Sequence, residues 1–119
     1  MEVCTSLRTI EEASYVLIRV KAAKLFDVKG IYDVKEVVRR HGLDFVKEEL
    51  KVLQSIIKDY DIRVLYDKAT LEELHEVMKR YRLLPGDALI ALTCKHYNIR
   101  RILTFDEDFR RVPWLRVIP

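Results

Sequence analysis

Two aspartates at the ends of predicted elements are the first candidates for chemistry. Asp87 opens one predicted helix, and Asp106 comes two residues after a strand predicted at residues 101–104. That helix should begin near the carboxyl edge of a sheet, and the strand should return to the same edge, where open α/β sheets bind their ligands. Two carboxylates that lie close together repel each other unless a cation holds them, and oxygen ligands of this kind suit Mg²⁺.

Each candidate acid also has a simpler structural interpretation. Asp87 lies where Asp is a favoured helix cap, and Asp106 can form an Asx-turn with the residues that follow it. Glu12 lies three residues after Thr9, a spacing that fits a capping box as well as a metal ligand. No single carboxylate therefore identifies a site, and the elements that position these side chains have to be considered.

Hydrophobic spacing predicts helices in the first half of the chain and alternating strands and helices in the second. Apolar residues at helical intervals predict a helix over 7–25, then a short helix that ends at Gly42, then a third helix capped by Asp44. Strands are predicted at residues 62–66, 101–104 and 114–118, and helices at 71–81 and 88–97. Thr70 and Glu73 form a capping box, and Asn98 can cap the last helix. Strands separated by helices imply a parallel α/β sheet covered on both faces.

Composition excludes several other classes of protein. The 119 residues fit one domain, residues 1–119, and the content of half hydrophobic and 34% charged residues excludes a disordered chain. Three glycines and three prolines are too few for an all-β sandwich. The longest apolar run, residues 88–92, is far too short to span a bilayer, so a cytoplasmic protein without membrane contact is expected. Cys4 and Cys94 lack the spacing of a zinc site.

Charge adds two weaker indications. A net charge of +3 is not that of a polycationic nucleic-acid coat. Abundant Lys, Arg and Glu, with Gln54 and Asn98 as the only amides, is a balance typical of hyperthermophiles.

Three motifs together resemble a known family. Leu-Pro-Gly-Asp-Ala-Leu-Ile-Ala at 84–91 and Ile-Leu-Thr-Phe-Asp-Glu-Asp-Phe at 102–109 resemble the C-terminal half of the PIN-domain ribonucleases, in particular the toxin subunits of VapBC toxin–antitoxin pairs. Ile-Glu-Glu-Ala-Ser-Tyr-Val-Leu at 10–17 resembles the first long helix of that family. The resemblance covers nearly the whole chain.

The resemblance implies a three-layer α/β/α sandwich whose acidic residues hold Mg²⁺ or Mn²⁺. A metal-activated water would then cleave single-stranded RNA, and an antitoxin protein would be a partner. Carried over by position, the catalytic residues and metal ligands are Glu12, Asp87 and Asp106, with Asp108 as a further ligand. Glu11 stays open as an alternative to Glu12. Thr104 would support the turn at Asp106.

Basic residues near these acids are candidates for contact with RNA phosphates. They are Arg80, Arg82, Arg110 and Arg111. Arg110 and Arg111 have the best claim because they directly follow the turn at Asp106. Basic residues near helix ends can instead balance the helix dipole or remain solvated.

The family's first strand, which ends in an Asp, has no counterpart ahead of Glu12. Either the chain begins late or it is a natural short form that lacks one ligand, so whether it is an active enzyme stays open. A missing central strand exposes backbone and apolar surface, which predicts a homo-oligomer that pairs across the gap. The alternative function is a catalytically incomplete PIN-like module that binds RNA or protein. The predicted strands argue against a third option, a helical DNA-binding or dimerisation domain.

Overall fold

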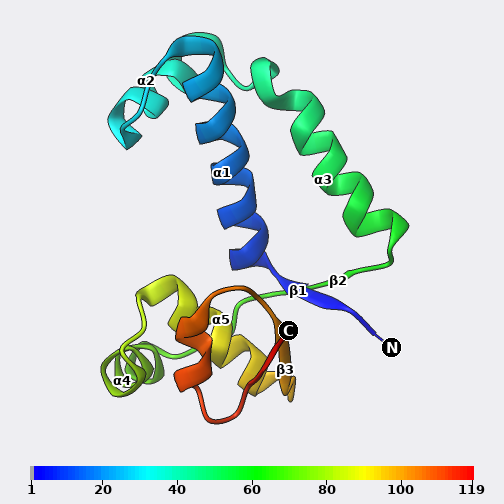
Figure 1. Cartoon of the computed structure of the whole chain (residues 1–119), viewed down its shortest axis with the longest axis vertical. Coiled ribbons are helices and arrows are strands. Elements are labelled where there is room, and N and C mark those ends of the chain that lie inside the picture. Colours follow the sequence, from blue (N-terminus) through cyan, green and yellow to red (C-terminus); the bar gives the residue numbers. More distant parts are fainter. Residues whose placement is uncertain (1) are drawn as a thin grey trace. The chain divides into compact units, whose positions relative to one another are not determined.

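A computed structural model describes residues 2–119 and divides them into two compact units, each with its own core (Figure 1). The helical unit contains residues 2–5 and 9–63, and the mixed unit contains residues 6–8 and 64–119. No helix in the described part of the chain is long and apolar enough to cross a membrane.

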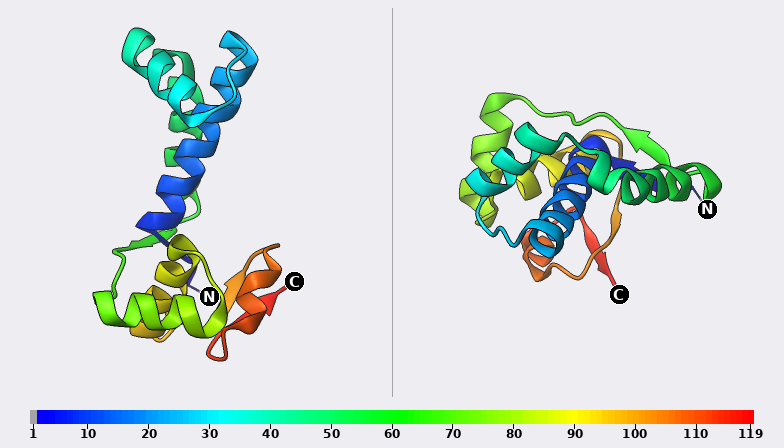
Figure 2. Two further views of the ribbon diagram at one scale, coloured as in Figure 1. Left: turned by 90° about the vertical axis from the view of Figure 1, so that its left-hand side faces the viewer. Right: turned by 90° about the horizontal axis from the view of Figure 1, so that it is seen from above.

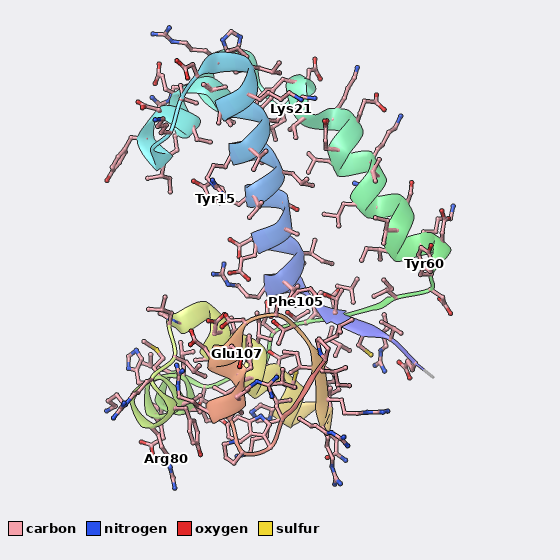
Figure 3. All side chains as sticks on the ribbon, in the orientation of Figure 1. Tyr15, Lys21, Tyr60, Arg80, Phe105 and Glu107 are labelled. Atoms are coloured by element: carbon pink, nitrogen blue, oxygen red, sulfur yellow. The ribbon has the colours of Figure 1, made fainter. Side chains whose placement is uncertain are left out.

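The helical unit contains α1 (Leu7–Phe26) from Thr9 onward, α2 (Ile31–His41), a 3₁₀ turn η1 (Asp44–Val46) and α3 (Lys47–Asp59). Its core is small, with Ala22, Val34 and Val37 buried among partly buried apolar neighbours. Lys21 of α1 reaches Glu49 of α3, with 2.8 Å between Nζ and Oε2, and Figure 3 labels this lysine. These helices lie where the apolar spacing predicts them.

Of the two helix boundaries predicted in this unit, at Gly42 and at Asp44, one is confirmed and one is wrong. Gly42 ends α2 as predicted, in a backbone conformation with φ of +67° that L-amino acids with a side chain rarely adopt. The prediction that Asp44 caps α3 was wrong, because Asp44 lies in η1 and the residue that caps α3 is Val46. Val46 is completely buried, so packing of this turn into the unit, rather than a capping side chain, decides where α3 begins.

The mixed unit contains β2 (Arg63–Leu65) from Val64 onward, α4 (Leu71–Tyr81), α5 (Pro85–His96), β3 (Arg101–Leu103), the 3₁₀ turn η2 (Glu107–Arg111) and β4 (Arg116–Ile118). β3 and β4 pair in parallel, with Ile102 opposite Val117, and lie side by side in both views of Figure 2. The predicted α/β class with parallel strands is confirmed. β1 (Cys4–Ser6), which the sequence did not predict, pairs with β2.

The core of the mixed unit forms around α5. Ala88, Ile90, Ala91 and Leu92 of this helix are buried, as expected of a helix that is apolar on nearly all sides. Trp114 closes one side by donating its indole N–H to the carbonyl oxygen of Ala91, 2.8 Å away. A firmly packed α5 fixes the position of the residues in its first turn.

α4 is held at its first turn by the predicted capping box, which is confirmed. The backbone N–H of Glu73 donates to Thr70 Oγ1 at 3.1 Å, and the N–H of Thr70 donates to Glu73 Oε1 at 2.9 Å. At the other end Arg82 adopts the left-handed conformation, with φ of +56°, and ends the helix.

Candidate metal centre

Three carboxylates of the mixed unit converge at one place. Asp87, Asp106 and Asp108, here called the acidic cluster, each offer an oxygen, and these oxygens all lie within 4.8 Å of one another. Asp87 lies in the first turn of α5, while Asp106 and Asp108 follow β3. The expected convergence of the helix start and the strand end is therefore present. Phe105 and Glu107, the chain neighbours of Asp106, are labelled in Figure 3.

The turn after β3 is ordered by its own side chains. The backbone N–H of Asp106 donates to Thr104 Oγ1 at 3.0 Å, and Asp106 Oδ1 accepts the N–H of Asp108 at 2.9 Å, so that Asp106 caps η2. Thr104 supports this turn in the way the resemblance implies. A carboxylate has two oxygens with several lone pairs, so the capping role of Asp106 leaves capacity for a cation.

Asp87 is not the helix cap that one interpretation predicts. Leu84 occupies the capping position and Pro85 is the first helical residue, which suits its fixed φ and missing N–H. Asp87 comes two residues later, in the first turn, where the positive end of the helix dipole favours a carboxylate.

Gly86 lies next to Asp87 and faces Arg8. A Cβ on Gly86 would lie only 2.7 Å from Nε of Arg8, so the guanidinium packs directly on the glycine backbone. The backbone N–H of Arg8 in turn donates to Asp67 Oδ1 at 3.2 Å. A glycine at this position therefore permits a cationic side chain beside the start of α5.

Arg111 connects the acidic cluster to α4. Its Nη1 donates to Asp108 Oδ1 at 2.9 Å, while Nε and Nη2 donate to the carbonyl oxygens of Tyr81 and Arg82 at 2.8 and 2.6 Å. These carbonyls belong to the end of α4, where helical carbonyls lack partners within the helix. Arg111 thus serves the fold through three hydrogen bonds. Its contact with RNA stays a prediction.

The other basic candidates lie on the exposed surface. Arg110 donates from Nε to Glu107 Oε2 at 2.6 Å and from Nη2 to the carbonyl oxygen of Pro119 at 3.3 Å. Arg80, labelled in Figure 3, lies over the ring of Tyr81 at 5.8 Å. Arg82 is exposed at the end of α4. Contact of these residues with RNA stays a prediction.

Glu12 belongs to the helical unit, where both it and Glu11 are exposed on α1. The capping-box interpretation of Glu12 was wrong, because Thr9 lies inside α1 and so cannot precede its first turn. A role for Glu12 or Glu11 as metal ligand stays a prediction.

Sequence reasoning missed Asp67 and the contacts of Arg111 with α4. Asp67 follows β2 just as Asp106 follows β3, so the rule that selected Asp106 could have selected Asp67 as well. The connection from Arg111 to α4 carries no such signal, because its partners there are backbone carbonyls about thirty residues earlier in the chain.

Comparison with known proteins identifies the class to which this fold and cluster belong. The sequence profile of the PIN domain matches residues 1–115, and the chain belongs to the PIN domain family. It is 38% identical over 93 residues to "Ribonuclease VapC2" and 34% identical over 93 residues to "Ribonuclease VapC6", both of Methanocaldococcus jannaschii. Each match covers 76% of this chain and 57% and 60%, respectively, of the relative, so the chain spans less than two thirds of either protein. No solved structure matches the chain.

Proposed function

We propose that this chain is a metal-dependent endoribonuclease of the PIN type that cleaves single-stranded RNA. The observation that carries the proposal is the acidic cluster, three carboxylate oxygens within 4.8 Å of one another, in a chain of the PIN domain family. The names of two relatives, both called ribonucleases, support the same activity.

The donors of the cluster fit a hard divalent cation. All three are carboxylates, the ligands that Mg²⁺ and Mn²⁺ prefer. Opposite ligands of an octahedral Mg²⁺ are about 4 Å apart, so small side-chain rotations bring oxygens within 4.8 Å into its reach. Arg111 offsets part of the negative charge through Asp108, but three adjacent carboxylates still favour a cation.

The residues of the chain have separate roles in the proposed reaction. Asp87, Asp106 and Asp108 hold the cation, and Glu12 (or Glu11) completes the ligands. When bound, the cation supplies neutralisation of phosphate charge and a lowered pKa for water. One of the carboxylates orients the attacking water and accepts its proton. Arg80, Arg82, Arg110 and Arg111 are proposed to contact RNA phosphates.

The proposed partners follow from the resemblance to the toxin subunits of VapBC pairs. They are a single-stranded RNA substrate, an antitoxin protein that restrains the nuclease, and further copies of the same chain. The cation is proposed to be Mg²⁺ or Mn²⁺.

Substitution of Asp87 tests the activity. Asp87→Asn keeps the size of the side chain and its place in the first turn of α5 but removes the charge. Cleavage of a single-stranded RNA in Mn²⁺ should fall by at least about 100-fold, because changes even outside the ligand shell of metal sites commonly cost 10–100-fold. The melting temperature should stay equal or rise, since one of three like charges is removed.

Asp33→Asn is the matched control, because Asp33 also lies in the first turn of a helix, α2, and is not part of the acidic cluster. It should cleave like the wild type. An Asp87→Asn variant that cleaves like the wild type would refute the assignment. RNA binding without cleavage by the wild-type chain would favour the catalytically incomplete module instead.

A further inference from the structure

Arg111 is held from three directions at once. Two of its nitrogens donate to the last carbonyls of α4, at Tyr81 and Arg82, and the third donates to Asp108. Phe109, two residues before Arg111, and Val112, directly after it, are buried, with only 4% and 1% of each exposed. The backbone that carries Arg111 is therefore anchored in the core, and its guanidinium plane is fixed by α4.

A fixed guanidinium restricts the carboxylate that it contacts. The planar fork of an arginine presents its donors in one rigid geometry, unlike the mobile ammonium of a lysine. Because Nε and Nη2 are fixed on α4, Nη1 can meet Asp108 Oδ1 in only one orientation. Asp108 itself lies on a short 3₁₀ turn and its side chain is about half exposed, so the turn alone restrains it weakly.

We propose that Arg111 is a positioning residue that orients Asp108 to bind the divalent cation. The inference rests on the metal centre of the proposed function. Arg110 provides the contrast, since it lies on the same turn with the same charge but donates to Glu107 and Pro119 rather than to the acidic cluster.

Charge and position act in opposite directions here, which makes the role testable. The positive charge of Arg111 repels a cation, so removing the charge alone should tighten metal binding. Loss of the fixed orientation of the Asp108 side chain should weaken metal binding. Arg111→Lys keeps the charge and loses the fork, while Arg111→Met loses both.

Mn²⁺ titration by calorimetry, without RNA, measures the effect. Arg111→Lys should bind Mn²⁺ about 10-fold more weakly than the wild type, the lower end of the range for residues that support metal ligands. Arg111→Met should also bind more weakly than the wild type, but by less, because it loses the repelling charge as well. The control Arg110→Met should bind as tightly as the wild type or slightly more tightly. Wild-type affinity in Arg111→Lys, or tighter binding in Arg111→Met, would overturn the proposal.

A double-mutant cycle separates positioning from a general effect on the fold. If Arg111 acts through Asp108, Arg111→Lys should weaken Mn²⁺ binding in the wild-type background and have no effect in an Asp108→Ala background. An equal weakening in both backgrounds, or a fall in melting temperature with unchanged Mn²⁺ affinity, shows a purely structural role and overturns the proposal. If Mn²⁺ binding depends on Arg111 but the wild-type chain does not cleave RNA, the result contradicts the proposed function and not the positioning role of Arg111.

Discussion

Asp106 carries out two tasks that the sequence presents as alternatives. Its Oδ1 accepts the N–H of Asp108 and so caps η2, and the same carboxylate belongs to the acidic cluster. The capping interaction also fixes the orientation of the carboxylate, which benefits any ligand role. The structural and functional interpretations of this aspartate are therefore compatible.

This double role predicts different effects of two substitutions on stability without metal. Asp106→Asn keeps an oxygen that can accept the N–H of Asp108 and removes one of three like charges. In the presence of a chelator it should melt at the wild-type temperature or higher. Asp106→Ala loses the acceptor, which costs about 1 kcal/mol or about 4 °C.

Differential scanning calorimetry of both variants in EDTA checks this pair. An Asn variant that melts as far below the wild type as the Ala variant does would show that the carboxylate charge itself stabilises the turn. Repeating the scans with Mn²⁺ adds a second comparison, because only the wild type should gain substantially from the ion.

The sequence predicted the aspartates of the site better than it predicted the arginine. Asp87 and Asp106 could be paired because the direction of a helix and of a strand determines the sheet edge at which each ends. Asp108 was selected through the family resemblance. Arg111 was identified as a basic residue, but its partners on α4 are backbone carbonyls, which no residue type encodes.

At the scale of elements, the capping box of α4 links stability to pH. Hydrogen bonding from the backbone of Thr70 lowers the pKa of Glu73 below its ordinary value of 4.5, and His96, with Nε2 2.9 Å from Oε2, lowers it further against the opposing effect of burial. A carboxyl group whose pKa is lower in the folded state stabilises the fold above its unfolded-state pKa. That contribution is lost as the pH falls through the lowered folded-state value.

Glu73→Gln should therefore be less stable than the wild type at pH 7, and the difference should shrink as the pH falls below the ordinary carboxyl pKa and through the lowered folded-state pKa of Glu73. The glutamine can still accept the N–H of Thr70, so the comparison isolates the charge. Melting curves followed by circular dichroism between pH 7 and pH 3 measure the difference in stability between Glu73→Gln and the wild type. A difference that stays constant over this range would contradict the assignment.

Helices with a capping signal or long apolar spacing were predictable, and elements held only by pairing or packing were not. Thr70 and Glu73 marked the start of α4 correctly because local hydrogen bonds decide it. Asp44 suggested a cap that burial of Val46 overrode. β1 has only three residues and forms by pairing with β2. β2 begins at Arg63, 57 positions after β1 ends at Ser6, so no local pattern marks β1 as a strand.

At the scale of the whole molecule, the helical unit has apolar surface beyond its small core. A groove of about 480 Å³ runs between α1 and α3, lined mainly by apolar side chains that include Ile10, Ile18, Leu50 and Leu53. On the same two helices, Val20 and Val52 are each more than half exposed. Apolar surface of this extent favours association.

We expect the chain to form homo-oligomers in solution. Size-exclusion chromatography with light scattering should give a mass above that of one chain, and Val52→Lys, which places a charge on the exposed side of α3, should shift the population toward monomer. A wild-type chain that stays monomeric at high micromolar concentration would contradict this expectation.

The central claim is that the acidic cluster holds a divalent cation, and calorimetric titration with Mn²⁺ tests it most directly. The wild-type chain should bind Mn²⁺ at a saturable site, and Asp106→Asn should weaken that binding by at least about 10-fold. Asp44→Asn, which changes an exposed aspartate outside the cluster, should bind like the wild type. Absence of a saturable Mn²⁺ site in the wild type, or equal affinity in Asp106→Asn, would contradict the account.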